Sequence, residues 1–403
     1  MIRSFEYRLY TTTEQDKKLM GCLRESRILY NEMLEVAVNE YKRSSHHLGK
    51  YELDAIFRGR GKECIPASTV QCLADRLSKS FKQFFNRKDY NFRMGFPRFK
   101  SVRQWRSIHL RQYGSPDKQL DVSLSKDGMF LNVPKKIGGR IKIKLHRPIG
   151  ETPKTVHLVL RADRHWYAII VCDCALTPTD QGCGQVGIDL GISSFITDSN
   201  ANKVSNPKHL IASQCILRRK QRALARSQRY SHRRGLAVES VAKTHLKVSR
   251  QRRDFLHKVS QSYANKYQNI IVEKLNVAGM LKNHHVAKSI LDASWSTFII
   301  LLTYKAESAG HQVIAVPAQY TSQKCSNCGE IVPKSLSVRT HICSHCGYIE
   351  DRDVNAAKNI LQAGARPSED NVVGYHMRPP ISLQQELEGV VTTFPRCLSS
   401  AVL

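Results

Sequence analysis

The sequence predicts a multidomain α/β protein, and three patterns support that prediction. Residues 106–176 alternate apolar and polar positions with a period of two, which is typical of short antiparallel strands. From residue 185 onward, short apolar runs alternate with long helical patterns, as in an α/β domain. Near the end of this second part, four cysteines stand in two Cys-x-x-Cys pairs. The length of 403 residues accommodates two or three domains with ample core.

The chain is strongly basic, with 63 Lys and Arg against 34 Asp and Glu and a net charge of +29. A globular protein with this excess usually meets a polyanion, so nucleic acid is the expected partner. We expect no membrane segment, because no run approaches the ~18 apolar residues of a spanning helix. The N-terminus lacks the apolar core of a signal peptide. Eight of the 12 cysteines have no metal spacing and are expected as reduced thiols, which indicates a cytosolic or nuclear setting.

The N-terminal part begins with a predicted strand over residues 2–10 and a helix that starts near Glu14. A second helix is expected over 68–85, and the strands of 106–176 suggest a small barrel or sandwich. Lysines and arginines occupy alternate strand positions, for example Arg140, Lys142 and Lys144. This basic face either lies on phosphates or is merely solvated.

The second part opens, after a predicted linker at 176–180, with two strands and a hairpin over 185–204. Asp189 lies in the first, otherwise apolar strand. A buried acid is costly unless it is paired or bound to metal, and a turn or capping acid is the alternative.

Two long basic helices are expected over 208–267. Between Arg218 and Lys258 there are 14 Lys or Arg and only two acids, which removes the salt-bridge explanation for the charge and favours a phosphate-facing surface over a solvated one. The residues expected on nearly one helical face are Arg218, Arg222, Arg229 and Arg233.

The remaining elements are a buried strand that carries Glu273 at its carboxyl end, a mobile basic loop over 276–290, a helix over 292–308 and a strand over 312–317. A final helix is expected from about Asp353 to Ala363, and the mixed, polar residues beyond 366 predict a poorly ordered tail.

The four cysteines follow the strand over 312–317. They are Cys325, Cys328, Cys343 and Cys346, and Gly329 and Gly347 follow the two pairs as turn glycines. Two such pairs complete a tetrahedral sulfur shell around zinc; a disulfide pair or reduced thiols are the alternatives. The spacing suits a closed structural site, so the catalytic candidates are the acids that come next, Asp351 and Asp353.

Three acids thus stand at the edges of predicted strands and helices: Asp189, Glu273 and Asp353. Converging carboxylates with no partner base suit two Mg²⁺ ions roughly 4 Å apart, which would hydrolyse a phosphodiester. The order β-β-β-α-β-α-β-zinc-α supports a ribonuclease H-like core around them.

Several motifs resemble those of one family. Gly187-Ile-Asp-Leu-Gly-Ile, Val272-Glu-Lys-Leu, and Asp351-Arg-Asp-x-Asn-Ala-Ala after the cysteine pairs are similar to the RuvC and zinc-ribbon motifs of TnpB, the RNA-guided endonucleases of insertion sequences. Tyr7-Arg-Leu-Tyr and Gly95-Phe-Pro-Arg-Phe also match. The resemblance runs from residue 2 to about 363, and the last motif is the most specific.

The resemblance implies an architecture and site roles. Asp189, Glu273 and Asp353 would be the RuvC catalytic acids, Arg339 would lie near the cleaved strand, and Gln71 would approach a short motif in duplex DNA. A glutamine at the flank of the core is the alternative for Gln71. The implied domains are a wedge β-barrel (1–10 and 95–180), a helical recognition insertion (11–94), a RuvC nuclease domain (181–319 and 348–365), a zinc-ribbon insertion (320–347) and a flexible tail (366–403).

The implied function is RNA-guided cleavage of double-stranded DNA by a monomeric ribonucleoprotein in the bacterial or archaeal cytoplasm, nucleoid-associated when bound. Base pairing with a transposon-end guide RNA would select the target, and the protein would read only the flanking motif. Two alternatives stay open: a catalytically silent RNA-guided repressor, and a structure-specific nuclease that needs no guide.

Overall fold

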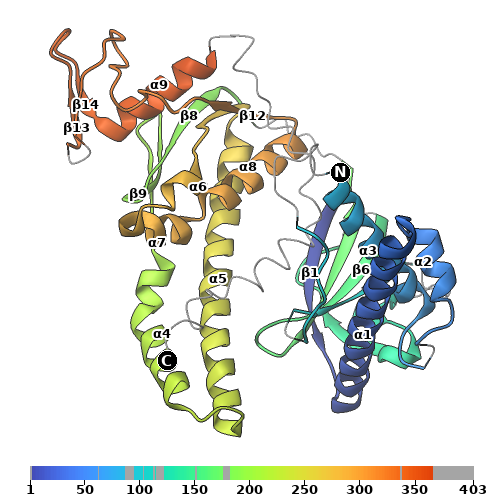
Figure 1. The fold of residues 1–403 in the computed structure, drawn as a ribbon. Coiled ribbons are helices and arrows are strands. Elements are labelled where there is room, and N and C mark those ends of the chain that lie inside the picture. The colour runs from blue at the N-terminus through green and yellow to red at the C-terminus, as the bar shows by residue number, and fades with distance from the viewer. Residues whose placement is uncertain are drawn as a thin grey trace. The chain divides into compact units, whose positions relative to one another are not determined.

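The computed structural model describes residues 2–61, 63–86, 95–102, 104–111, 114, 122–149, 152–175, 182–335 and 338–365. These residues form two compact units, one up to Ala175 and one from residue 182 onward (Figure 1). The predicted linker at 176–180 and the predicted tail at 366–403 lie outside the described residues.

Unit 1 combines one antiparallel sheet with three helices. Its elements are β1 (Ile2–Tyr10), α1 (Thr13–Ser44), α2 (Lys50–Ile56), α3 (Ala67–Phe85), β2 (Ser107–Leu110), β3 (Ser123–Leu124), β4 (Phe130–Asn132), the short 3-10 helix η2 (Lys135–Ile137), β5 (Arg140–Lys144), β6 (Thr152–Leu160) and β7 (Trp166–Asp173). The seven strands are ordered β2-β6-β7-β1-β5-β4-β3. Among the described residues β2 and β3 do not pair with each other, so closure into a barrel stays a prediction.

Local sequence explains most elements of unit 1. Thr12 caps α1, because its side chain accepts from the Gln15 N–H while the Gln15 side chain accepts from the Thr12 N–H. In β5, Ile141 and Ile143 are buried and the three basic residues between and beside them are exposed, as the period of two predicts. Helix α2 was not predicted, because seven residues are too few for a clear apolar period.

Unit 2 is an α/β domain with an inserted ribbon. Its elements are β8 (Gln185–Leu190), β9 (Ser194–Asp198), β10 (Lys203–Ser205), α4 (His209–Arg226), α5 (His232–Lys266), β11 (Asn269–Glu273), α6 (Val277–Met280), α7 (His284–Ala293), α8 (Trp295–Ala309), β12 (Gln312–Val316), β13 (Thr340–Ile342), β14 (Ile349–Asp351) and α9 (Arg352–Ala365). The sheet order is β10-β9-β8-β11-β12, with β8, β9 and β10 antiparallel and with β11 and β12 parallel to β8. The strands follow one another in the predicted order, and α6 and α7 are additional helices between β11 and α8.

The two faces of this sheet have different partners. Val186, Ile188 and Val272 belong to a large core that also contains residues of α5 and α8. Ile271 points to the other face, where it packs with Ile360 of α9. Because side chains alternate along a strand, each odd-numbered position of β8 and β11 faces α9 (Figure 1).

The prediction of a mobile loop at 276–290 is wrong, because this stretch contains two short helices, α6 and α7. Asn276 and Asn283 cap these helices by accepting hydrogen bonds from backbone N–H groups. Residues 284–309 are the one described stretch that is long and apolar enough to cross a membrane. Ser294, with φ of 54°, breaks this stretch between α7 and α8. Phe298, Leu302 and Ala306 of α8 are fully buried in the core of unit 2, which is typical of a core helix.

Candidate active site and zinc ribbon

Strands β8 and β11 place Asp189 and Glu273 on one face of the sheet. The parallel register pairs Ile271 with Gly187 and Val272 with Ile188, so the next step along both strands brings Glu273 beside Asp189. Neighbouring strands lie about 4.8 Å apart. Asp189 and Glu273 are each two residues beyond a position that faces α9, and both carboxylates therefore lie on the α9 face.

Helix α9 lies unusually close to this face, because two glycines leave room for it. A Cβ added at Gly187 would overlap the Ala357 carbonyl oxygen, and a Cβ added at Gly364 would overlap the side chain of Ile271. The first of these glycines belongs to the same strand as Asp189. Asp353 lies in the first turn of α9, and its negative charge acts on Asp189.

The electrostatics agree with this placement. Burial, together with the negative charges of Glu273 and Asp353, raises the pKa of Asp189 to about 8, and Arg352 partly opposes the shift. Burial also raises the pKa of Glu273, which a hydrogen bond donated by the Thr321 hydroxyl partly opposes. All three acids are half-buried. The structure thus brings the three predicted residues into one electrostatic cluster.

Only the cysteines, among the described residues, bring three or more ligand atoms within 4.8 Å of one another. The three carboxylates are not such a group. Carboxylate oxygens are the donors that Mg²⁺ prefers, so the residues fit a pair of these ions.

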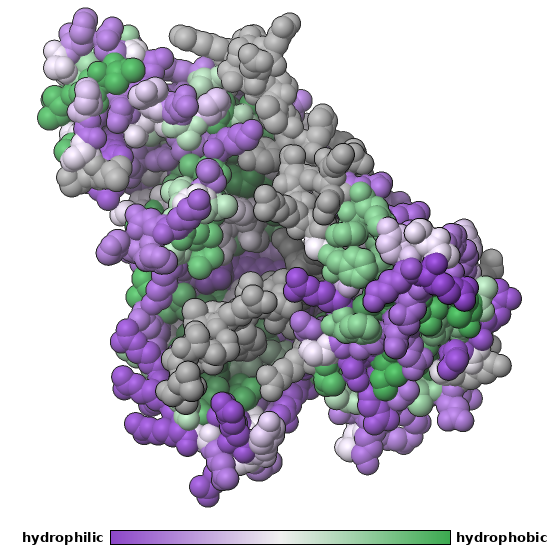
Figure 2. All heavy atoms as spheres, in the orientation of Figure 1, coloured by the Kyte–Doolittle hydropathy of each residue, from purple (hydrophilic) through white to green (hydrophobic). Residues whose placement is uncertain are grey.

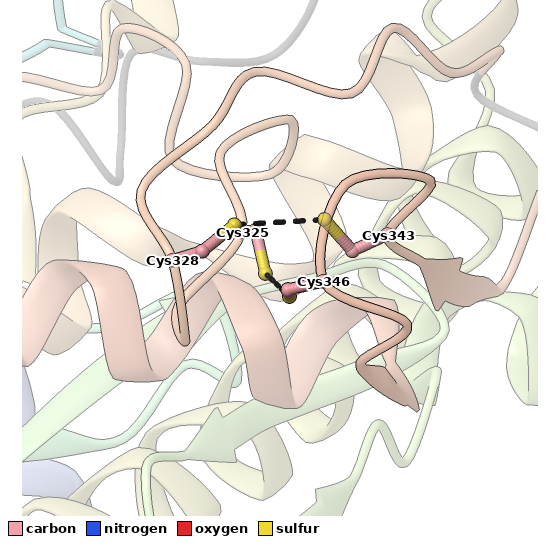
Figure 3. Close-up of side chains that lie close together, drawn as sticks. All are labelled: Cys325, Cys328, Cys343 and Cys346. Carbon is pink, nitrogen blue, oxygen red and sulfur yellow. Dashed lines mark hydrogen bonds between the residues drawn. The ribbon is translucent and has the colours of Figure 1, made fainter.

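The ribbon gathers the four cysteine sulfurs into one cluster (Figure 3). The Sγ atoms of Cys325 and Cys346 are 3.7 Å apart, and those of Cys328 and Cys343 are 3.6 Å apart. Zn–S bonds of about 2.3 Å in a tetrahedron place sulfurs about 3.8 Å apart. The cluster thus fits a structural zinc ion.

Each knuckle of the ribbon is built in the same way. The Gly329 N–H donates to the Cys325 carbonyl and the Gly347 N–H donates to the Cys343 carbonyl, both at 2.9 Å. Both glycines have positive φ, 86° and 72°, which a residue with a side chain rarely adopts. The predicted role of these glycines is confirmed.

Helix α9 holds the first knuckle directly. Asn355 is fully buried; its side chain accepts from the Ser326 N–H at 2.9 Å and donates to the Lys324 carbonyl at 2.8 Å. Asn359 also donates to the Lys324 carbonyl, at 2.7 Å, and Gln362 donates to the Ser326 carbonyl at 2.8 Å. The helix that carries Asp353 is thereby joined to the zinc ribbon.

The residues predicted to contact nucleic acid are exposed, but one part of that prediction is wrong. Arg218 and Arg222 lie on α4, Arg229 lies in the connecting turn and Arg233 lies on α5, so the four do not share one helical face. Hydrophilic side chains cover much of the visible surface of this helical hairpin (Figure 2). Gln71 of α3 and Arg339 of the ribbon are also exposed.

Beside the acids, sequence reasoning missed Thr321 and named Asp351 as a candidate catalytic acid without finding its capping role. Thr321 donates to Glu273, and no sequence signal marks it. Asp351 accepts from two N–H groups in the first turn of α9. An Asp just before a predicted helix is a common N-cap, and that signal was present.

The fold and the site together define an α/β protein with an acid cluster beside a mixed five-stranded sheet and with an inserted four-cysteine ribbon. Family models match residues 1–46 (helix-turn-helix domain), 158–284 (OrfB_IS605, "Probable transposase") and 295–360 ("Cas12f1-like, TNB domain"). A protein of Streptomyces pristinaespiralis is named "Putative RNA-guided DNA endonuclease". It is 30% identical to this chain over 91% of this chain and 90% of its own length. InsQ of Escherichia coli, which has the same description, is 29% identical over 74% of this chain and 75% of its own.

The chain belongs to the TnpB family. A solved structure, the Cas12f1-sgRNA-target DNA complex, has the same fold with a TM-score of 0.56. That similarity covers 90% of this chain and 98% of the other at 13% identity.

Proposed function

We propose that the protein is an RNA-guided DNA endonuclease of an insertion sequence, which cleaves double-stranded target DNA with Asp189, Glu273 and Asp353. The observation that supports the proposal is that Asp189 and Glu273 share the sheet face that α9 covers, and that Asp353 of α9 acts electrostatically on Asp189. Relatives named as RNA-guided DNA endonucleases support the reaction class. All three acids are present, which favours a nuclease over a silent repressor.

The three acids would hold two Mg²⁺ ions. When bound, such a pair activates a water and stabilises the leaving oxygen of a phosphodiester. Asp189 and Glu273 supply oxygen ligands from adjacent strands, and Asp353 supplies a third from α9. Thr321 orients Glu273 through its hydrogen bond. The ribbon, with structural zinc, fixes where α9 begins and so where Asp353 lies.

We assign the nucleic-acid contacts to the basic surfaces. The exposed arginines of the α4–α5 hairpin and the exposed Lys and Arg of β5 would lie on phosphates of the guide RNA and its heteroduplex. Gln71 would hydrogen-bond an adenine of the flanking motif, and Arg339 would contact the cleaved strand. The wedge barrel (1–10 and 95–180), recognition helices (11–94), RuvC domain (181–319 and 348–365) and ribbon (320–347) are proposed with these boundaries. We expect an intracellular, monomeric ribonucleoprotein.

Sequencing the RNA that copurifies with the protein tests the guide. The purified complex is then given a plasmid library that carries the complementary target beside random flanking sequence, with Mg²⁺. We expect cleavage only of targets that match the guide and carry one short flanking motif. Binding without cleavage would instead establish the repressor function, and cleavage without any guide would establish the structure-specific nuclease.

A further inference from the structure

Asp351 lies at the joint between the ribbon and α9. It is the last residue of β14 and directly precedes Arg352, the first residue of the helix. Its Oδ1 accepts hydrogen bonds from the N–H groups of Asp353, at 3.0 Å, and Val354, at 3.2 Å. These are the positions whose N–H groups an N-cap side chain satisfies, so Asp351 caps the turn that carries Asp353.

The second oxygen of Asp351 reaches the sheet. Its Oδ2 accepts from Lys203 Nζ at 2.7 Å. Lys203 of β10 pairs with Thr197 of β9, and Thr197 pairs with Asp189 of β8. Residues directly opposite each other in adjacent strands point to the same face, so Lys203, Thr197 and Asp189 form one row across the sheet. The ion pair therefore joins the start of α9 to the row that contains Asp189.

We propose that Asp351 is a positioning residue: its cap fixes the turn that carries Asp353, and its ion pair with Lys203 fixes that turn relative to Asp189. The inference rests on the proposed function, since it assigns a role beside the same three acids. Both carboxylate oxygens of Asp351 are already hydrogen-bonded to protein donors. We therefore assign Asp351 to holding the proposed ligand Asp353 in place, and not to binding metal itself.

Three variants separate the two contacts. Asp351→Ala removes both, Asp351→Asn keeps a capping oxygen but loses the ion pair, and Lys203→Met loses only the ion pair. The pair is 42% exposed on the Lys203 side and 37% on the Asp351 side, so its loss alone has a small effect. The cap contributes more, because replacing an Asp N-cap by Ala weakens the first turn about tenfold.

The first measurement needs no activity. Amide hydrogen exchange of the free protein should be about tenfold faster at Asp353 and Val354 in Asp351→Ala, and near wild type in Asp351→Asn and Lys203→Met. Calorimetric titration of the free protein with Mn²⁺ alone should show the weakest binding for Asp351→Ala. Binding by Asp351→Asn should be intermediate, and binding by Lys203→Met should be nearest to that of the wild type. Ser231→Ala is the matched control, because Ser231 caps α5 by accepting from the Arg234 N–H, away from the acids.

The second measurement uses the guide-loaded protein. Asp351→Ala should require at least about tenfold more Mg²⁺ for half-maximal cleavage, with target binding and zinc content unchanged, and Asp351→Asn should restore most of the loss. If Asp351→Asn were as inactive as Asp351→Ala, Asp351 would be a ligand and the inference would be wrong. The inference would also be wrong if amide exchange at Asp353 and Val354 in Asp351→Ala were as slow as in the wild type. The same holds if Asp351→Ala lost zinc and target binding together with cleavage. A wild-type protein that fails to cut would contradict the proposed function instead, and the exchange and Mn²⁺ measurements would still test the cap.

Discussion

The zinc ribbon and the acid cluster are both ligand sets, yet they are built in opposite ways. The ribbon takes its four ligands from residues 325–346, and two turns with positive-φ glycines set their geometry locally. The acid cluster takes its ligands from residues 189, 273 and 353, which meet only because β8, β11 and α9 pack together. Since α9 also holds the first knuckle, the acid cluster depends on the ribbon, whereas the ribbon does not depend on the acids.

Removal of the ribbon should break both sites and is the largest effect we expect. Cys325→Ser with Cys328→Ser removes half of the sulfur ligands of a closed site, and structural zinc contributes on the order of 10 kcal/mol in isolated zinc fingers. We expect loss of one zinc per protein, measured by atomic emission, together with loss of cleavage. The matched control, Cys183→Ser with Cys215→Ser, replaces two exposed cysteines outside the cluster and should retain both.

Removal of an acid should break one site only. Asp189→Ala deletes a ligand of the proposed ion pair, and cleavage should fall roughly a thousandfold or more, since metal stabilisation of the developing charge is worth several kcal/mol. Zinc content and the affinity for guide and target should stay at wild-type values. The control Asp254→Asn changes an exposed acid that pairs with Lys258 on the surface of α5. Retained cleavage by Asp189→Ala would refute the assignment.

The link between the sites can be weakened separately. Asn355→Ala deletes two hydrogen bonds to the first knuckle and leaves the half-buried Ser326 N–H and Lys324 carbonyl with fewer partners. We expect unfolding free energy to fall by about 2–3 kcal/mol, measured by urea denaturation, and zinc to be released faster to a chelator. Asn265→Ala removes an exposed amide that pairs with Gln261 and should change neither. If zinc release were unchanged, the ribbon would not depend on this contact.

The smallest effect concerns stability without Mg²⁺. The pKa of Asp189 is about 8 in the folded protein and about 4 in an unfolded chain, so the folded state binds more protons between these values. Stability should therefore fall as the pH rises from about 4 to about 8. Asp189→Asn should remove most of this fall and be more stable than wild type at pH 8. Urea denaturation in Mg²⁺-free buffer measures the difference; a lower stability for Asp189→Asn would contradict it.

Sequence prediction was most accurate where the relevant interactions are local. The cysteine spacing, the turn glycines and the alternation in β5 each follow from a few neighbouring residues. It failed where an element boundary depends on polar caps. The turn before Ser231 separates Arg229 from the helix that was expected to carry it, and Asn276 and Asn283 start helices in a predicted loop. These caps are visible in the sequence, but side chains of this kind occur as often in turns.

The sequence by itself determined the ligand chemistry of this protein: four thiolates at zinc spacing, three acids at the edges of strands and a helix, and a large excess of positive charge. The tertiary structure decided which acids share a face, because strand register and the close approach of α9 at Gly187 are set by packing between segments far apart in the chain. It also decided the role of Asp351, since whether a carboxylate caps, pairs or binds metal depends on the atoms that surround it in space.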